Sequence, residues 1–169
     1  LAMDPGNATE QVQGAATKEP AFGLDALWIA ESDKEKAQFA GYTVVDLSTV
    51  LTTHLTEVIK AHAHEILGRQ ETQELLDHLS VTYPKVVEEL VPGLLTLGQV
   101  QQVLAGLLRE GISIRDLRTI LETLSDWAPT VKIPEKLGEA VRRRISRTIV
   151  GQYLSCLLYT SDAADDCEG

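Results

Sequence analysis

The spacing of the hydrophobic positions changes near residue 46 of this chain. Before that position, the apolar runs at 27–29 and 42–45 contain large or β-branched residues and predict two short β-strands. The segment between them, 33–40, predicts a helix that follows a serine cap and ends at Gly41. We therefore expect a small βαβ-like part at the N-terminus.

From residue 46 onward, apolar residues recur at helical spacing. The first helix of this region is expected to continue until Gly68 stops it. Its apolar stripe should face inward, as in other amphipathic helices. The stripe consists of Leu51, Leu55, Val58, Ile59, His62 and Ile66.

Further amphipathic helices are predicted at about 70–80, 84–91, 97–110, 114–124 and 135–150. Their inward positions are Leu75, Leu76, Leu79, Val100, Val103, Leu104, Leu107, Leu108, Leu117, Ile120, Leu121, Leu124, Leu137, Val141, Ile145 and Ile149. The two helices joined by 111–114 are expected to pack as a pair. The fold class is therefore α+β and predominantly helical, with packed amphipathic helices of several small subdomains.

Charge and cysteine content narrow the functional classes. A formal net charge of −10 disfavours a nucleic-acid groove, because phosphate binding needs a basic surface. The sequence contains no run of about 18 apolar residues and no signal-peptide pattern at its start. Cys156 and Cys167 are too few for a disulfide framework or a zinc site.

The histidines are the first candidates for chemistry. His54, His62 and His64 share one predicted helix, and His78 follows on the next. Two ligands on one helix should stand three or four positions apart, whereas His62 and His64 point to nearly opposite sides and His54 lies roughly 80° from each. We expect His62 to be a packed interior histidine or a subunit contact. The others should be partly exposed.

Other catalytic patterns are missing from the sequence. It contains no Gly-x-Ser-x-Gly elbow, no P-loop and no Gly-x-Gly-x-x-Gly after a strand. The arginines of 142–147 are interpreted as a solvated helix face, and binding of an acidic partner or a phosphate is the minor alternative. The residues therefore predict no enzyme and no cofactor. The alternative is a metal-dependent hydrolase that uses His54, His62 and His64.

Several sequence blocks occur in an order that is specific to one family. They are "EPAFGLDALWI", "AGYTVVD", "STVLTTHLTEVI", "LGRQETQELLD", "VEELVPGLL" and "IRDLRTILETLSDWAP". Together they resemble the cytoplasmic domain of the FlhA-type export-gate proteins of the bacterial flagellar type III secretion apparatus. The resemblance covers about residues 1–153.

The resemblance implies a role in protein export rather than catalysis. Members of this family dock export chaperones that carry flagellar subunits, and they contact other proteins of the export apparatus. The resemblance also implies a membrane-anchored protein of the bacterial inner membrane, with this segment on the cytoplasmic side. The complete protein would form a nonameric ring.

The resemblance also implies a division into subdomains. Residues 1–42 would belong to the first cytoplasmic subdomain, and 43–91 would form a small helical second one. Residues 92–111 would return to the first, and 112–154 would begin a truncated third. The remaining residues, 155–169, resemble translated sequencing adapter and are interpreted as an artefact.

The family's docking site is a hydrophobic dimple between the first two subdomains. By alignment on "GRQ", the dimple would be built from the end of the long helix and from "VPGLLTLG". The residues expected in its wall are Ile59, Leu67, Val91, Pro92 and Leu97. His64 and Gly98 depart from the family pattern. An ordinary core role is an equal alternative for each wall residue.

Overall fold

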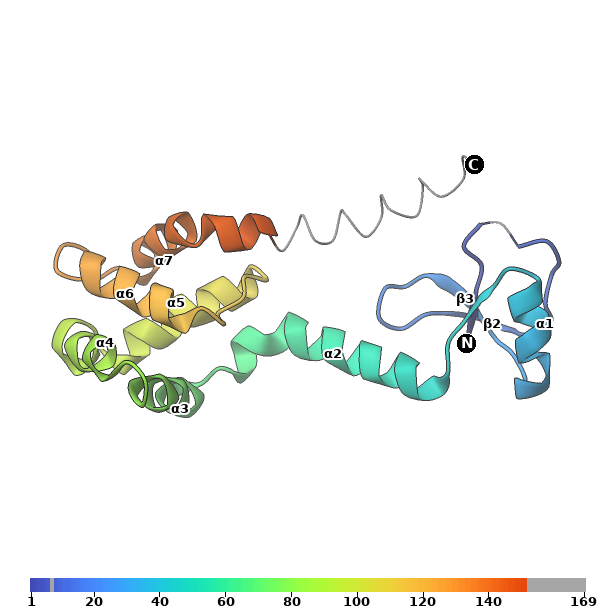
Figure 1. Cartoon of the computed structure of the whole chain (residues 1–169), viewed down its shortest axis with the longest axis horizontal. Helices are drawn as coiled ribbons and strands as arrows, with labels where there is room; N and C mark the ends of the chain where they lie inside the picture. The colour runs from blue at the N-terminus through green and yellow to red at the C-terminus, as the bar shows by residue number, and fades with distance from the viewer. Residues whose placement is uncertain (7, 152–169) are drawn as a thin grey trace. The chain divides into compact units, whose positions relative to one another are not determined.

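A computed structural model describes residues 1–6 and 8–151 of the chain (Figure 1). The described residues form two compact units, one from Leu1 to Ala61 and one that begins at His62. The predicted artefact at 155–169 and both cysteines lie outside the described residues. The subdomain division implied by the resemblance stays a prediction.

The first unit contains a small antiparallel sheet with the strand order β2-β3-β1-β4. Its strands are β1 (Ala2–Met3), β2 (Ala15–Lys18), β3 (Asp25–Trp28) and β4 (Thr43–Val44). Because β1 pairs antiparallel with both β3 and β4, those two strands are parallel to each other. The chain connects them through η1 (Glu31–Asp33) and α1 (Lys34–Phe39). The βαβ-like expectation is confirmed, with β1 inserted between its strands.

The turn between β2 and β3 is organised by a buried carboxylate. Glu19 is 5% exposed, and its two carboxylate oxygens accept the backbone N–H groups of Ala21 and Phe22 at 2.9 and 2.6 Å. These bonds compensate for the cost of removing the charge from water. The turn leaves Phe22 and Leu24 exposed beside the sheet.

The long helix α2 (Leu47–Ile66) differs from expectation in its burial. The stripe predicted to face inward is half exposed at Leu51, Leu55, Val58 and Ile59, and Ile66 at its end is 59% exposed. Within the first unit, only Val50 of α2 is buried, in a cluster with Leu1 and Ala26. The inward prediction was wrong because periodicity locates the apolar side of a helix without showing that another element covers it.

The second unit is helical. Its elements are α3 (Arg69–Ser80), α4 (Pro84–Glu88), the irregular segment η2 (Glu89–Leu94), α5 (Leu97–Arg109), α6 (Leu117–Trp127) and α7 (Pro134–Arg144). A turn at Ile145 ends α7, and helix resumes over 146–151. We expected α5 and α6 to pack as a pair, but each makes its main contacts with α7 (Figure 1). That expectation was wrong because a short connection does not decide which neighbour covers an apolar face.

One hydrophobic core unites these helices. All inward positions predicted from Leu75 onward belong to it or pack against it, and Leu76, Leu104, Ile120, Leu121, Leu124, Leu137 and Val141 are fully buried. Local signals begin α5 and α6, because Thr96 forms a capping box with Gln99 and Asp116 accepts the Thr119 N–H. The predominantly helical α+β class is confirmed.

Within the described ranges, no single helix is long and apolar enough to cross a membrane. One bent pair, Pro84–Leu94 with Leu97–Arg109, meets the length and composition test only when its two helices are taken together.

Candidate functional site

The residues expected in a docking wall fall into different environments. Leu67 lies directly after α2, is 7% exposed and belongs to the main core of the second unit. Its carbonyl oxygen accepts a hydrogen bond from the Gln101 side-chain nitrogen at 2.9 Å. Leu67 is therefore a core residue whose backbone is tied to α5.

Val91 and Leu97 are only partly buried and pack against the same core as Leu67. Val91 interrupts the helical backbone of η2 with φ of −122° and ψ of 124°, and the adjacent Pro92 is exposed. Ile59 lies in the first unit and is 49% exposed. The structure thus brings Leu67, Val91 and Leu97 to one cluster, and their role in binding stays a prediction.

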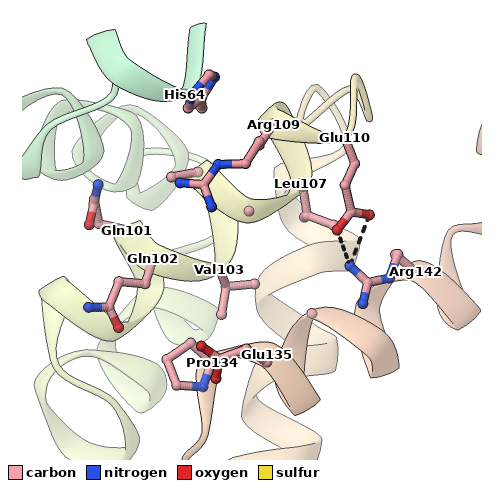
Figure 2. Close-up of a pocket in the computed structure, with 13 residues that line it drawn as sticks. His64, Gln101, Gln102, Val103, Leu107, Arg109, Glu110, Pro134, Glu135 and Arg142 are labelled. Carbon is pink, nitrogen blue, oxygen red and sulfur yellow. Dashed lines mark hydrogen bonds and ion pairs between the residues drawn. The ribbon is translucent and has the colours of Figure 1, made fainter. Parts of the chain in front are cut away.

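Beside this cluster, α5 and α7 enclose a pocket of about 400 Å³ (Figure 2). His64 lines one side, α5 contributes the floor, and the start of α7 forms the opposite side. The residues with polar side chains are His64, Gln101, Gln102, Arg109, Glu110, Glu135 and Arg142. The apolar lining includes Val103, Leu107 and Pro134.

One arginine side chain of the pocket pairs with a carboxylate, and the other does not. The Arg142 Nη1 donates to both carboxylate oxygens of Glu110, at 2.7 and 2.9 Å. The Arg109 side chain forms no hydrogen bond or ion pair with any residue in 1–6 or 8–151. Within the arginine run predicted to be solvated, Arg143, Arg144 and Arg147 are exposed, whereas Arg142 is 34% exposed and pairs with Glu110. The sequence pattern did not indicate a role for Arg109, apart from placing it near the end of a predicted helix.

The histidines do not form a metal centre in the described part of the chain. No group of three or more His, Cys, Asp or Glu side chains there is placed to hold a metal ion. Of the two roles expected for His62, the interior one was wrong, because its side chain is 57% exposed and its Nδ1 lies 3.1 Å from a Glu65 oxygen. The subunit contact stays a prediction. The hydrogen bond from His62 lowers the pKa of the Glu65 carboxyl below its ordinary value, and the charge of His62 lowers it further.

The other histidines are placed as the sequence indicated. His54 and His64 are half-buried, and His78 is exposed. The Nδ1 atoms of His54 and His64 are buried without a hydrogen-bond partner among the described residues. His64 therefore lines the pocket, while its unpaired Nδ1 is shielded from solvent.

Comparison with known proteins gives one family over nearly the whole chain. The FHIPEP family profile matches residues 1–158. The chain is similar to the flagellar biosynthesis protein FlhA of Bacillus subtilis, with 48% identity over 153 residues, which are 90% of this chain and 23% of that protein. It is 50% identical over 153 residues to the FlhA of Escherichia coli, covering 90% of this chain and 22% of that protein.

Solved structures resemble the fold as well as the sequence. The nonameric SctV-C of EPEC matches with a TM-score of 0.67 and 30% identity, over 90% of this chain and 46% of that one. The Chlamydia pneumoniae CdsV, solved in complex with CdsO, matches with a TM-score of 0.69 and 33% identity, over 76% of this chain and 39% of that one.

Proposed function

Because this chain belongs to the FHIPEP family, we propose that it is part of a protein-docking platform in the flagellar type III export apparatus. In this role it binds export chaperones that carry substrates during flagellum assembly. The similarity to FlhA proteins of two distant bacteria supports the flagellar role. The chain spans about a fifth of the length of those relatives, at 23% and 22%, so the proposal concerns a role within a larger assembly.

The structural support is a partly exposed apolar surface that packs against a buried core. Val91 and Leu97 pack against the core that contains Leu67, and each keeps part of its side chain accessible beside the exposed Pro92. Apolar side chains that are held in place by a core lose little conformational entropy on binding. We call Val91, Pro92 and Leu97 the docking wall, with Leu67 as its support.

The proposal includes an oligomeric ring and a membrane-anchored complete protein. SctV-C, which is 30% identical to this chain, is nonameric, and CdsV forms a complex with CdsO. These two findings support self-association and contacts with other proteins of the apparatus. This segment would lie on the cytoplasmic side of the bacterial inner membrane. The proposal requires no catalytic residue.

Leu97 is the best position for a test. It is the first residue of α5, where an acidic side chain is compatible with the helix dipole, so Leu97→Asp should fold. The buried Leu67 is a poor choice, because an aspartate there would disturb the core. Val81→Asp provides a matched control, since Val81 is 85% exposed and outside the docking wall.

The measurement is a calorimetric titration of subunit-loaded export chaperone against the complete cytoplasmic region. A charge placed in an interface that excludes water costs a few kcal/mol, so Leu97→Asp should weaken binding about a hundredfold. Val81→Asp should leave it unchanged. Undiminished affinity in a folded Leu97→Asp protein would place docking elsewhere.

A further inference from the structure

We propose that the pocket between α5 and α7 binds a single carboxylate carried by a protein segment, and that Arg109 pairs with it. The inference deepens the proposed docking function and rests on it for the kind of partner. The carboxylate could belong to an acidic side chain or to a chain terminus, and both present the same planar pair of oxygens to a guanidinium.

The first argument is the unequal state of the two arginines. Arg142 is already satisfied by both oxygens of Glu110. Arg109 has no partner within the described ranges, although it lines the same pocket. Figure 2 shows its side chain turned back along α5, toward the side of the pocket that His64 and Gln101 line.

The pocket is also polarised. Glu135 is the remaining carboxylate of the lining besides the paired Glu110, and it lies with Pro134 at the end opposite to Arg109 (Figure 2). The Glu135 carboxylate and the Arg109 guanidinium therefore lie at opposite ends of the pocket. The Gln102 amide of the lining can donate a further hydrogen bond to a carboxylate.

Size and charge exclude larger anions. A volume of about 400 Å³ accommodates one or two side chains. One free guanidinium balances one carboxylate, whereas a polyanion would also meet the net charge of −10 of the chain. The planar fork of arginine matches a carboxylate in two parallel hydrogen bonds.

A protein segment is the favoured carrier because Gln101 links the pocket to the residue that supports the docking wall. Gln101 lines the pocket and donates to the carbonyl oxygen of Leu67, which supports that wall. A bound segment can therefore place apolar side chains on Val91 and Leu97 and a carboxylate at Arg109. Together these contacts would combine apolar affinity with charge specificity.

The test uses three synthetic peptides of one otherwise uncharged, N-acetylated sequence. The first has an internal glutamate and an amidated C-terminus, the second has glutamine and a free C-terminus, and the third has glutamine and an amidated C-terminus. Each is titrated into the 169-residue chain while the amide resonances of Gly106 and Gly138 in the pocket are followed by NMR. Gly111, outside the lining, serves as a reference.

We expect a saturable shift at Gly106 and Gly138 with at least one carboxylate peptide and none with the neutral peptide. The peptide that binds identifies the source of the carboxylate. Arg109→Gln should weaken binding about tenfold, the usual effect of losing a charged hydrogen-bond donor. Arg109→Lys should recover part of the affinity, and Arg115→Gln at an exposed arginine outside the pocket should change nothing.

Absence of saturable shifts with both carboxylate peptides would overturn the inference, and so would equal affinity in a folded Arg109→Gln protein. Neither result would affect chaperone binding by the docking wall, which the Leu97→Asp titration tests separately. Conversely, chaperone binding that is insensitive to Leu97→Asp would overturn the docking wall while leaving the peptide result intact.

Discussion

Arg142 of α7 and Glu110 at the end of α5 form an ion pair with two hydrogen bonds across 32 positions of the chain. The pair closes one side of the pocket and connects the two helices that enclose it. Because the Glu110 carboxylate already pairs with Arg142, Arg109 is the arginine of the pocket that can interact with a partner protein.

The first prediction concerns this ion pair. Its side chains are 34% and 47% exposed, so solvent screens the attraction, and Arg142→Ala should lower the free energy of unfolding by no more than about 1 kcal/mol. Urea titrations of Arg142→Ala, Glu110→Ala and the double variant measure the coupling. Arg143→Ala, at an exposed arginine of the same helix, is the control. Additive losses from the two single variants would show that the pair contributes nothing.

The second prediction concerns Leu67. Its side chain is 7% exposed within the main core, so Leu67→Ala should cost about 2–5 kcal/mol of unfolding free energy. Leu67→Asp should lose cooperative unfolding altogether, because the core provides no partner for the charge. Thermal melts followed by circular dichroism distinguish these outcomes. A sharp, unshifted melt of Leu67→Asp would mean that Leu67 faces solvent.

The third prediction tests the exposed face of α2. Leu55 is 60% exposed, and Leu55→Ser should change the free energy of unfolding by less than about 0.5 kcal/mol. Val50 is 4% exposed, and Val50→Ala removes two methyl groups at a cost of about 1.6 kcal/mol. Chemical denaturation of both variants provides the comparison. A larger loss for Leu55→Ser than for Val50→Ala would show that the stripe is covered.

The fourth prediction concerns the start of α2. The pKa of Asp46 lies below its ordinary value, first because the Thr49 backbone N–H donates to it at 2.8 Å and then because the Thr49 hydroxyl also donates. A carboxylate whose pKa is lower in the folded state stabilises that state above its unfolded pKa of about 3.9. This contribution is lost as the pH falls through the lower, folded value.

Helix content measured by circular dichroism from pH 6 to pH 2 tests this linkage. Asp46→Asn keeps a capping oxygen that does not titrate, so its signal should fall less steeply below about pH 4. Lys18 and His62 lower the pKa values of Asp25 and Glu65 as well. These two carboxyl groups titrate in both the original protein and the Asp46→Asn variant, so they do not contribute to the difference. If helix content falls identically with pH in both proteins, Asp46 does not stabilise the start of α2.

The fifth prediction concerns metal. Because no suitable group of ligands exists within 1–6 and 8–151, added zinc should leave the melting temperature unchanged, and a chelator should have no effect. Elemental analysis after gel filtration is the direct measurement. Stoichiometric zinc that is lost together with the fold would favour the hydrolase alternative.

The sequence by itself determined the helices of the second unit and their buried faces. Val100, Val103, Leu104 and Leu107 recur at helical spacing on α5, and all four are buried. The same holds for α6, where local caps also mark the start of the helix. Such features are readable because they depend on residues within a few positions of one another. The strands β1 and β2 were missed because one has two residues and the other is mostly small or polar.

Only the tertiary structure decided which apolar faces are covered and which charges meet. The stripe of α2 obeys the same periodicity as that of α5, yet Leu51 and Leu55 remain exposed while Val100 and Val103 are buried. Likewise, adjacent arginines on α7 look alike in sequence, but Arg142 pairs with Glu110 and Arg143 stays in solvent. Helical spacing specifies the direction of a side chain on its own helix. The partner in that direction comes from a distant segment, and only long-range packing brings it there.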